Sequence, residues 1–416
     1  MLPAYAFSPA PSYASLPCAG HSTVEYTPRA GTGASTVTLT KKWRHLTVIF
    51  KGQSSEDADA APTYGRNSIV CGEMGVEHPD NVLTITIQLE GRIKLSSSDC
   101  GSMTQKIIDE RRTVWDVSKS GRCPTVVGFS VAFPMTYKDE NRVYRVPPTY
   151  ETICLGSPLM VVKCTYRFSI TITRTSTRRL SFRKTASKMY AQSIRWVKRT
   201  RPARPIIQDA SFLTSFKAAP SEWHQMEVMM PTRWHNLVEP IVCQFIIPSV
   251  QTFCLSDNIP IHIQLCGSQT SLGLFYGSIS PEALQPGKKP RRRHYAAIVR
   301  VFLARQIYLD VNGRQSWRTI PVGEGTLRAI PPAPHDENVD AAVVSVDWEG
   351  EVRCKSSDVT CASFNVNHLV VKDFIIFALT PANVRASPLL PIQHAHPIRL
   401  VTDGWTADDT AHPEDR

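Results

Sequence analysis

The feature that most constrains the fold is an alternating run of residues near the middle of the chain. Between residues 160 and 174, apolar side chains take every second position at Tyr166, Phe168, Ile170 and Ile172. Successive side chains of a β-strand point to opposite faces, so this pattern predicts a strand with one buried face. Residues 199–205 (RTRPARP) follow, and their prolines cannot donate to a sheet ladder and restrict the residues before them. The sequence therefore predicts a stiff joint between two β-rich halves.

Strand-like runs lie on both sides of this joint. They cover residues 46–50, 81–95, 126–134, 241–247, 259–265, 296–312, 325–330, 343–353, 369–379 and 397–401. Gly91 predicts a bulge or bend, and the pairs Asn312–Gly313 and Glu349–Gly350 predict tight turns. Residues 104–115 predict a short helix. The fold class expected is all-β, with two tandem immunoglobulin-type β-sandwiches joined by a short hinge.

Length and composition agree with two domains. The chain has 416 residues, of which 42% are hydrophobic, enough for two cores of ordinary size. Residues 1–36 are rich in Pro, Ser and Tyr and predict a disordered tail. We expect a first sandwich over 37–200, a hinge over 201–209, a second sandwich over 210–402 and an acidic tail over 403–416.

Charge and cysteine usage indicate where such a chain works. The formal net charge is +11, which favours acidic partners without identifying them. The 11 cysteines contain no C-x-x-C pair and fall mostly in strand-like runs, as buried thiols in a reducing compartment do. The first twenty residues lack a signal-peptide pattern, and no apolar run approaches the roughly 20 residues of a membrane span. We therefore expect a cytoplasmic protein.

Several short segments, taken in order, resemble the fungal arrestin-like (α-arrestin) proteins. They are VPPTYE (146–151), RTRPARP (199–205), VRVFLARQ (299–306), VGEG (322–325), DWEGEVR (347–353), LVVKDF (369–374) and HPIRLV (396–401). The resemblance extends from about residue 37 to 402. It implies two arrestin-like β-sandwiches in a non-enzymatic adaptor without a cofactor. Such an adaptor binds cytoplasmic tails of membrane transporters or receptors at the plasma membrane or endosomes, and couples them to a WW-domain, HECT-type ubiquitin ligase.

Three segments are candidates for docking the ligase. Pro147, Pro148 and Tyr150 form a P-P-x-Y sequence, and WW domains bind such segments because paired prolines are already in the polyproline II conformation. The alternative is that this segment is the turn into the next strand, with Tyr150 packed inward. Weaker single-proline versions lie in the N-terminal tail, at Leu2, Pro3 and Tyr5 and at Pro11 and Tyr13. Family members with a ligase role usually carry such motifs after the second sandwich, and residues 402–416 contain none.

Two basic stretches are candidates for binding phosphate or other anions. The first contains Arg178, Arg179, Lys184, Lys198 and Arg199 on an expected strand pair. On one face, they could bind phosphorylated tails or anionic lipid; alternatively they form a solvated face. The second contains Lys288, Lys289, Arg291, Arg292 and Arg293. It fits a nuclear-import signal, a phosphoinositide contact or a solubilising loop.

The residues predict neither catalysis nor a metal site. Cys354 and Cys361 have no second pair, and His394 and His396 have no companions in the sequence. The carboxylates of Asp347, Glu349 and Glu351 alternate along one strand, where they meet solvent or the basic residues of a neighbouring strand. No aromatic residues accompany the basic run at 288–293, so we expect no nucleic acid. An alternative function is a basic nuclear or transcription-associated β-sandwich protein.

Overall fold

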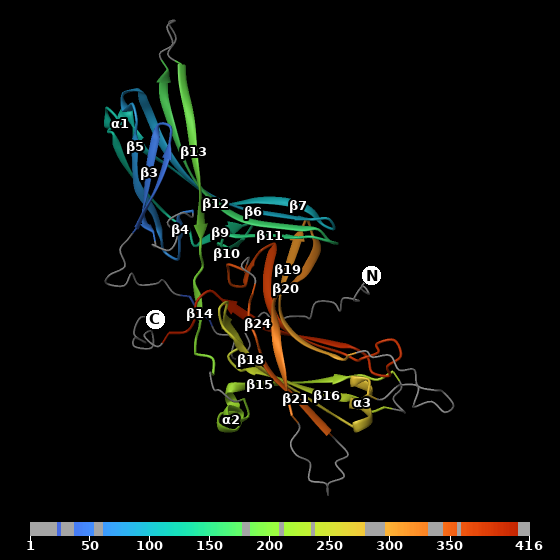
Figure 1. The fold of residues 1–416 in the computed structure, drawn as a ribbon. Helices are drawn as coiled ribbons and strands as arrows, with labels where there is room; N and C mark the ends of the chain where they lie inside the picture. The colour runs from blue at the N-terminus through green and yellow to red at the C-terminus, as the bar shows by residue number, and fades with distance from the viewer. Residues whose placement is uncertain are drawn as a thin grey trace.

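The chain folds into twisted β-sheets with a few short helices, as Figure 1 shows for the computed structural model. The structure describes residues 23–25, 37–53, 61–176, 184–207, 212–233, 238–278, 296–331, 344–355 and 359–406. The expected all-β class is confirmed. No helix within these ranges is long and apolar enough to cross a bilayer.

The first half contains a four-stranded and a six-stranded sheet. The four-stranded sheet has the order β2 (Val37–Trp43), β3 (Leu46–Gln53), β5 (Ile69–Val76) and β8 (Val126–Ala132). The six-stranded sheet has the order β4 (Thr63–Tyr64), β13 (Lys184–Trp196), β12 (Met160–Ser176), β6 (Val82–Ser97) and β7 (Gly101–Asp116), with β11 (Tyr150–Cys154) beside β12. The small elements are η2 (Pro79–Asn81), α1 (Val117–Ser120), β9 (Thr136–Asp139) and β10 (Arg142–Arg145).

The second half is built on one ten-stranded sheet. Its order is β15 (Trp223–Met230), β16 (Ile241–Pro248), β18 (Ile259–Gly267), β21 (Val344–Val352), β20 (Arg314–Ile330), β19 (Ile298–Val311), β23 (Leu369–Thr380), β24 (Ile392–Val401) and β17 (Thr252–Cys254), with β22 (Phe364–Val366) beside β23. Its helices are α2 (Phe212–Ala218), η3 (Pro220–Glu222) and α3 (Gln269–Tyr276). The helix η3 is a single short turn directly before β15.

Alternating side chains fill the core of each half, from two sheets in the first half and from distant strands of one sheet in the second. In the first half, Phe50 and Phe129 of the four-stranded sheet pack on Phe168 of β12, with ring centroids 5.0–5.8 Å apart. In the second half, Phe245 and Phe377 stack at 5.4 Å. The expected strand at 160–174 is thus the centre of the first core.

The two cores are joined at one place. The ends of β19 and β23 reach the six-stranded sheet, visible in the middle of Figure 1, and bury Ile307, Leu309 and Val371 in the first core. A hydrogen bond of 2.9 Å between the hydroxyls of Ser97 and Ser316 also crosses this contact. The halves therefore share packed side chains in addition to the covalent joint.

The helix expected at residues 104–115 is wrong, because this segment is strand β7 along the whole of β6. Two register shifts explain the error. One lies at Gly91/Arg92, where the ladder passes from Ile108 to Lys106, and the other at Ile85/Thr86, where it passes from Trp115 to Thr113. Each bulge inserts an extra residue and breaks the period of two, so the apolar residues of β7 imitate helical spacing. The bulge expected at Gly91 is confirmed.

The two expected turns have different outcomes. Asn312 and Gly313 form a two-residue hairpin loop with φ values of 56° and 74°, so this prediction is confirmed. Glu349–Gly350 is not a turn but lies within β21. A Cβ atom at Gly350 would lie 1.9 Å from the carbonyl oxygen of Thr326, so the glycine is needed for close approach of two strands.

Three residues of the N-terminal segment form a strand that pairs with the joint. Residues Thr200–Pro202 form strand β14, which pairs with β1 (Thr23–Glu25). Part of the expected tail thus returns to the joint and is held there by a short ladder. This ladder positions the site described next.

Candidate anion-binding site

A cationic cavity of about 660 Å³ lies at the junction of the two halves, around the carboxylate of Glu25. Three of its cations come from the first half, namely Arg66, Arg145 and Lys198. The fourth, Arg399, comes from β24 in the second half. Three of these cations act on the Glu25 carboxylate, and Arg399 lines the same cavity beside Thr23.

Local structure places each of these side chains. Glu25 is the last residue of β1 and pairs with Thr200, the first residue of β14. Thr200 lies two positions after Lys198, so the ladder brings Glu25 beside the lysine. Arg145 ends β10, and Arg66 lies in the turn after β4. Arg399 donates to the hydroxyl of Thr23 at 3.1 Å and so fixes the other end of β1.

The carboxylate of Glu25 is the hub of this cluster. It pairs with the ammonium of Lys198 at 2.7 Å and with the guanidinium of Arg145, and Arg66 donates to the backbone carbonyl of Glu25 at 3.4 Å. Partial burial by itself would raise the pKa of Glu25, but Lys198, Arg145 and Arg66 outweigh it and lower this pKa. The cavity is built to hold negative charge.

The arrangement can bind an anion in place of, or beside, this carboxylate. Arginine presents a planar fork of donors that matches phosphate and carboxylate oxygens, and lysine adds a point charge. Arg145 keeps 66% of its side chain exposed and Glu25 keeps 24%, so the cluster is open to solvent. Phosphate groups or acidic side chains are the ligands that this chemistry suits.

Among the described residues of the first basic stretch, Lys184 lies at one end of β13, and Lys198 and Arg199 follow its other end. Lys198 lines the cavity, and Arg199 pairs with Asp403 at 3.2 Å and lines a smaller adjoining hollow that Lys198 also lines. Lys184 begins β13, opposite Ser176 and far along the strand from Lys198. Arg178 and Arg179, like the run Lys288, Lys289, Arg291, Arg292 and Arg293, lie outside the described residues.

Three cavity residues were missed by sequence reasoning. Arg66, Arg145 and Arg399 are isolated basic residues in three distant segments, with no charge run around them. Only the tertiary fold brings them together. Position 145, two residues before the Pro147–Pro148 pair, offered no distinguishing pattern.

The P-P-x-Y segment is packed inward. Tyr150 is 4% exposed, and its ring meets Phe364 edge-to-face with centroids 5.5 Å apart. Burial raises the pKa of its phenol above the usual range. The inward-packed alternative is therefore what the structure has, and the tyrosine is not available to a WW domain in this conformation. The candidates at Leu2, Pro3, Tyr5, Pro11 and Tyr13 lie outside the described residues.

A second charged cluster lies beside Tyr150 and is fully buried. Arg305 of β19 and Asp373 of β23 face each other in register and form a two-pronged ion pair at 2.8 and 3.1 Å. Arg305 also donates to the carbonyl of Cys361 at 3.0 Å. Burial alone would lower the pKa of the guanidinium, but Asp373 raises it above the usual range. Burial raises the pKa of the Cys361 thiol to about 11, so this cysteine is not a nucleophile at neutral pH.

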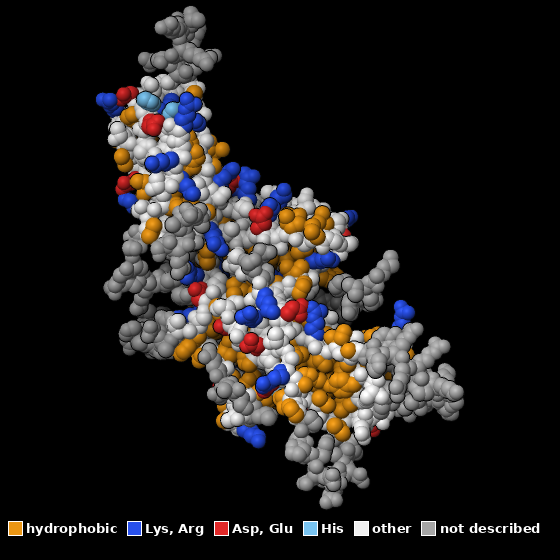
Figure 2. All heavy atoms as spheres, in the orientation of Figure 1, with side chains coloured by type: hydrophobic (Ala, Val, Ile, Leu, Met, Phe, Trp, Pro, Cys, Tyr) orange, Lys and Arg blue, Asp and Glu red, His pale blue; other side chains and the backbone are white. Residues whose placement is uncertain are grey.

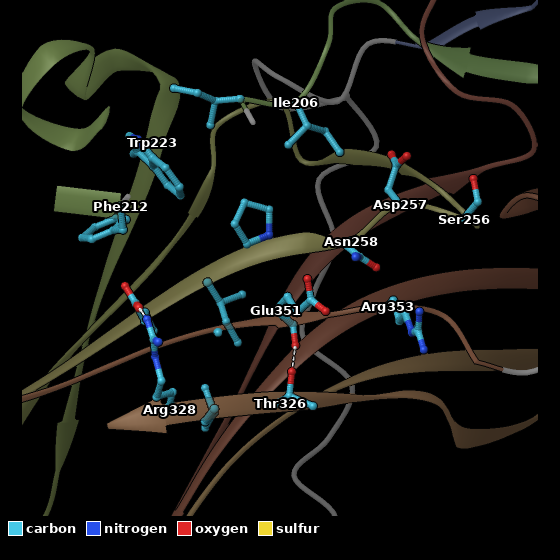
Figure 3. Close-up of a pocket in the computed structure, with 16 residues that line it drawn as sticks. Ile206, Phe212, Trp223, Ser256, Asp257, Asn258, Thr326, Arg328, Glu351 and Arg353 are labelled. Carbon is cyan, nitrogen blue, oxygen red and sulfur yellow. Dashed lines mark hydrogen bonds and ion pairs between the residues drawn. The ribbon is translucent and has the colours of Figure 1, made fainter. Parts of the chain in front are cut away.

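A larger hollow of about 960 Å³ lies on the outer face of β18, β21 and β20, with Phe212 and Trp223 at one side (Figure 3). Its floor carries two of the three alternating carboxylates, Glu349 and Glu351. Glu349 pairs with Arg328 of the neighbouring strand, as expected for a face that meets basic residues.

The third of these carboxylates, that of Asp347, also has hydrogen-bond partners. Asp347 accepts hydrogen bonds from His262 at 3.1 Å and from Gln264 at 3.0 Å.

The described residues contain no group of three or more His, Cys, Asp or Glu side chains that could hold a metal ion. The ten cysteines that the structure describes are all free thiols, most of them buried.

Comparison with known proteins returned neither a matching protein-family model nor a significant match among curated proteins.

Proposed function

We propose that the chain is an arrestin-like adaptor made of two tandem β-sandwiches, which binds phosphorylated or acidic segments in the cytoplasmic tails of membrane transporters or receptors. The observation that carries this proposal is the cavity around Glu25, where both halves supply cations and three of these four cations act on one carboxylate.

The anion class follows from the donors. Arg145 and Lys198 already hold a carboxylate that comes from an extended strand of the same chain. A tail segment with phosphoserine or phosphothreonine carries more negative charge and more acceptor oxygens than glutamate. Such a segment would compete with Glu25 for the same donors, and it would bind in an extended form beside β14.

The test is peptide binding to the full chain. Fluorescence anisotropy would compare a labelled acidic peptide carrying two phosphothreonines with its unphosphorylated form, for the wild type and for Arg145→Glu/Lys198→Glu. We expect a preference for the phosphorylated peptide that the double variant reduces by about tenfold or more, as loss of charge-assisted bonds predicts. Lys119→Glu, on exposed helix α1, is the matched control. Equal binding of both peptides by the wild type would refute the site.

Coupling to a WW-domain ubiquitin ligase is a separate part of the proposal. Because Tyr150 is buried, the candidates for docking are Tyr5 and Tyr13 in the N-terminal segment. Proximity labelling in cells should capture a WW-domain ligase with the wild type and lose it with Tyr5→Ala/Tyr13→Ala, whereas Tyr150→Phe should have no effect. If the double variant still captures the ligase, docking through Tyr5 and Tyr13 is refuted, and the proposal on tail binding is unaffected.

A further inference from the structure

The turn between β11 and β12 exposes three large apolar side chains, which we call the apolar tip. Leu155 is 77% exposed, Ile153 55% and Leu159 46%. The turn is held in place, because the guanidinium of Arg318 donates to the carbonyls of Ser157 at 2.6 Å and of Leu155 at 3.0 Å. A fixed loop that presents apolar side chains to water is unusual and points to a contact with something outside the chain.

Strand register places a basic band directly behind the apolar tip. Ile153 lies opposite Val161, and the next rung on the same face contains Glu151, Lys163 and Lys94. The rung after that contains Thr165, Arg92 and Lys106. At about 3.3 Å per residue, these rungs lie roughly 7 and 13 Å from the Ile153 rung.

The two rungs of the basic band carry a net positive charge. Its two rungs contain four cations and one carboxylate, and Lys163 pairs with Glu151 while Arg92 and Lys106 pair with Glu90 and Asp109. Lys94 forms no ion pair within the described part of the chain, although it lies opposite Lys163. Like charges on one rung repel each other, so a negatively charged surface would relieve them.

We propose that the apolar tip inserts into an anionic membrane surface, with Lys94 and Lys163 against the lipid phosphates. Apolar side chains followed by lysine and arginine at the depth of the headgroups are the pattern of peripheral membrane contacts. Figure 2 shows hydrophobic side chains gathered at the end of the sheet that carries β7 and β11, with basic side chains next to them. Each partner in a protein–protein interface supplies roughly 20–30 residues, whereas the apolar tip has three large apolar side chains. Its small size therefore favours a membrane surface over a protein partner.

The residues of this contact are distinct from those that line the cavity around Glu25. An adaptor that holds a cytoplasmic tail in the cavity and lipid at the apolar tip would have two weak contacts at one membrane. Linked contacts of this kind add avidity without a new interface.

The test is flotation of the full chain with vesicles of phosphatidylcholine alone or with about 30% phosphatidylserine. We expect binding to the anionic vesicles only, about tenfold weaker for Leu155→Ser/Leu159→Ser because insertion scales with buried apolar area. Leu155→Trp should keep the affinity and show fluorescence quenching by brominated lipid above that of the wild type.

Ile69→Ser/Val126→Ser, which removes two comparably exposed side chains from the four-stranded sheet, is the matched control and should bind as the wild type does. The proposal is overturned if the wild type ignores anionic vesicles, if Leu155→Ser/Leu159→Ser binds them unchanged, or if brominated lipid quenches the Leu155→Trp variant no more than the wild type. Phosphopeptide affinity measured on the same variants separates the two sites, since the tip variant should leave it unchanged. If Leu155→Ser/Leu159→Ser lost peptide binding but still bound vesicles, the tip would be a protein contact and membrane insertion would be refuted.

Discussion

Two arginine–carboxylate clusters near the junction of the halves use the same chemistry in opposite surroundings. Arg305 and Asp373 are each 1% exposed, and both prongs of the guanidinium are satisfied by the carboxylate. Glu25 and its partners Arg145 and Lys198 line a cavity that is open to solvent. The first cluster has no room for another ligand, whereas the second can exchange its carboxylate for a different anion.

The difference separates a structural ion pair from a binding site. Removing two charges from water costs several kcal/mol, and a buried pair persists only when its hydrogen bonds are complete, as they are at Arg305. The cavity cluster gains less from pairing because water screens it. A weakly held carboxylate is what a site for a competing anion requires. Three of the predictions below test this contrast, and one tests the packing of Tyr150 beside the buried pair.

The largest effect is expected at the buried pair. Asp373→Ala leaves the Arg305 charge buried without its counter-ion and should lower the free energy of unfolding by about 3–5 kcal/mol. Glu25→Ala, the matched change in the cavity, should cost about 1 kcal/mol or less. Urea denaturation followed by tryptophan fluorescence measures both.

A double variant keeps this test informative if Asp373→Ala fails to fold. Arg305→Met/Asp373→Leu replaces the pair with apolar groups and should recover most of the lost stability. If Asp373→Ala and Glu25→Ala were equally mild, the contrast between the clusters would be wrong.

The next effect concerns Tyr150, which packs beside the buried pair and contacts Phe364. Tyr150→Ala should destabilise the fold by about 3 kcal/mol through loss of a buried ring, while Tyr150→Phe should cost less than about 1 kcal/mol. Thermal melting distinguishes the two variants. A Tyr150→Ala variant as stable as the wild type would show that the ring is not a packing element and would reopen its role as a ligase ligand.

Most strands could be predicted from the sequence because their signal is local. The alternation at Tyr166, Phe168, Ile170 and Ile172 survives in the structure as the buried face of β12. Strand β7 could not be predicted, because two bulges shift its side chains between faces, and a bulge depends on the partner strand. Gly350 was taken for a turn residue because the close approach of Thr326 is invisible in sequence.

The candidate site was less accessible to sequence reasoning than the fold. Charge runs were the only available signal, and they selected Lys198 and Arg199 but passed over Arg66, Arg145 and Arg399. A cavity between halves collects single residues from segments that are far apart in the chain. Proximity of that kind is set by the ladder of β1 with β14 and by the packing of the halves, neither of which has a local pattern.

A smaller effect is the pH dependence of the cavity cluster. Burial acts to raise the pKa of Glu25, but its cationic neighbours lower it overall, so the folded state binds this proton less tightly than the unfolded state. The stability it contributes is fully present above the unfolded pKa of about 4.3 and is lost as the pH falls through the lower folded value. The difference in unfolding free energy between the wild type and Glu25→Gln should therefore shrink between about pH 6 and pH 3. A difference that stays constant over this range would mean that the carboxylate charge plays no part in holding β1.

The smallest effect separates the clusters by salt. Double-mutant cycles would measure the coupling energy of Glu25 with Arg145 and of Arg305 with Asp373 at about 0.1 M and about 1 M salt, where the Debye length falls from about 10 to about 3 Å. The exposed pair should have a coupling of a few tenths of a kcal/mol that disappears at high salt. The buried pair lies out of reach of ions in solution and should keep its coupling. A salt-sensitive Arg305–Asp373 coupling would mean that water enters the junction of the halves, whereas a salt-resistant Glu25–Arg145 coupling would mean that the carboxylate is too firmly held for phosphate to displace it.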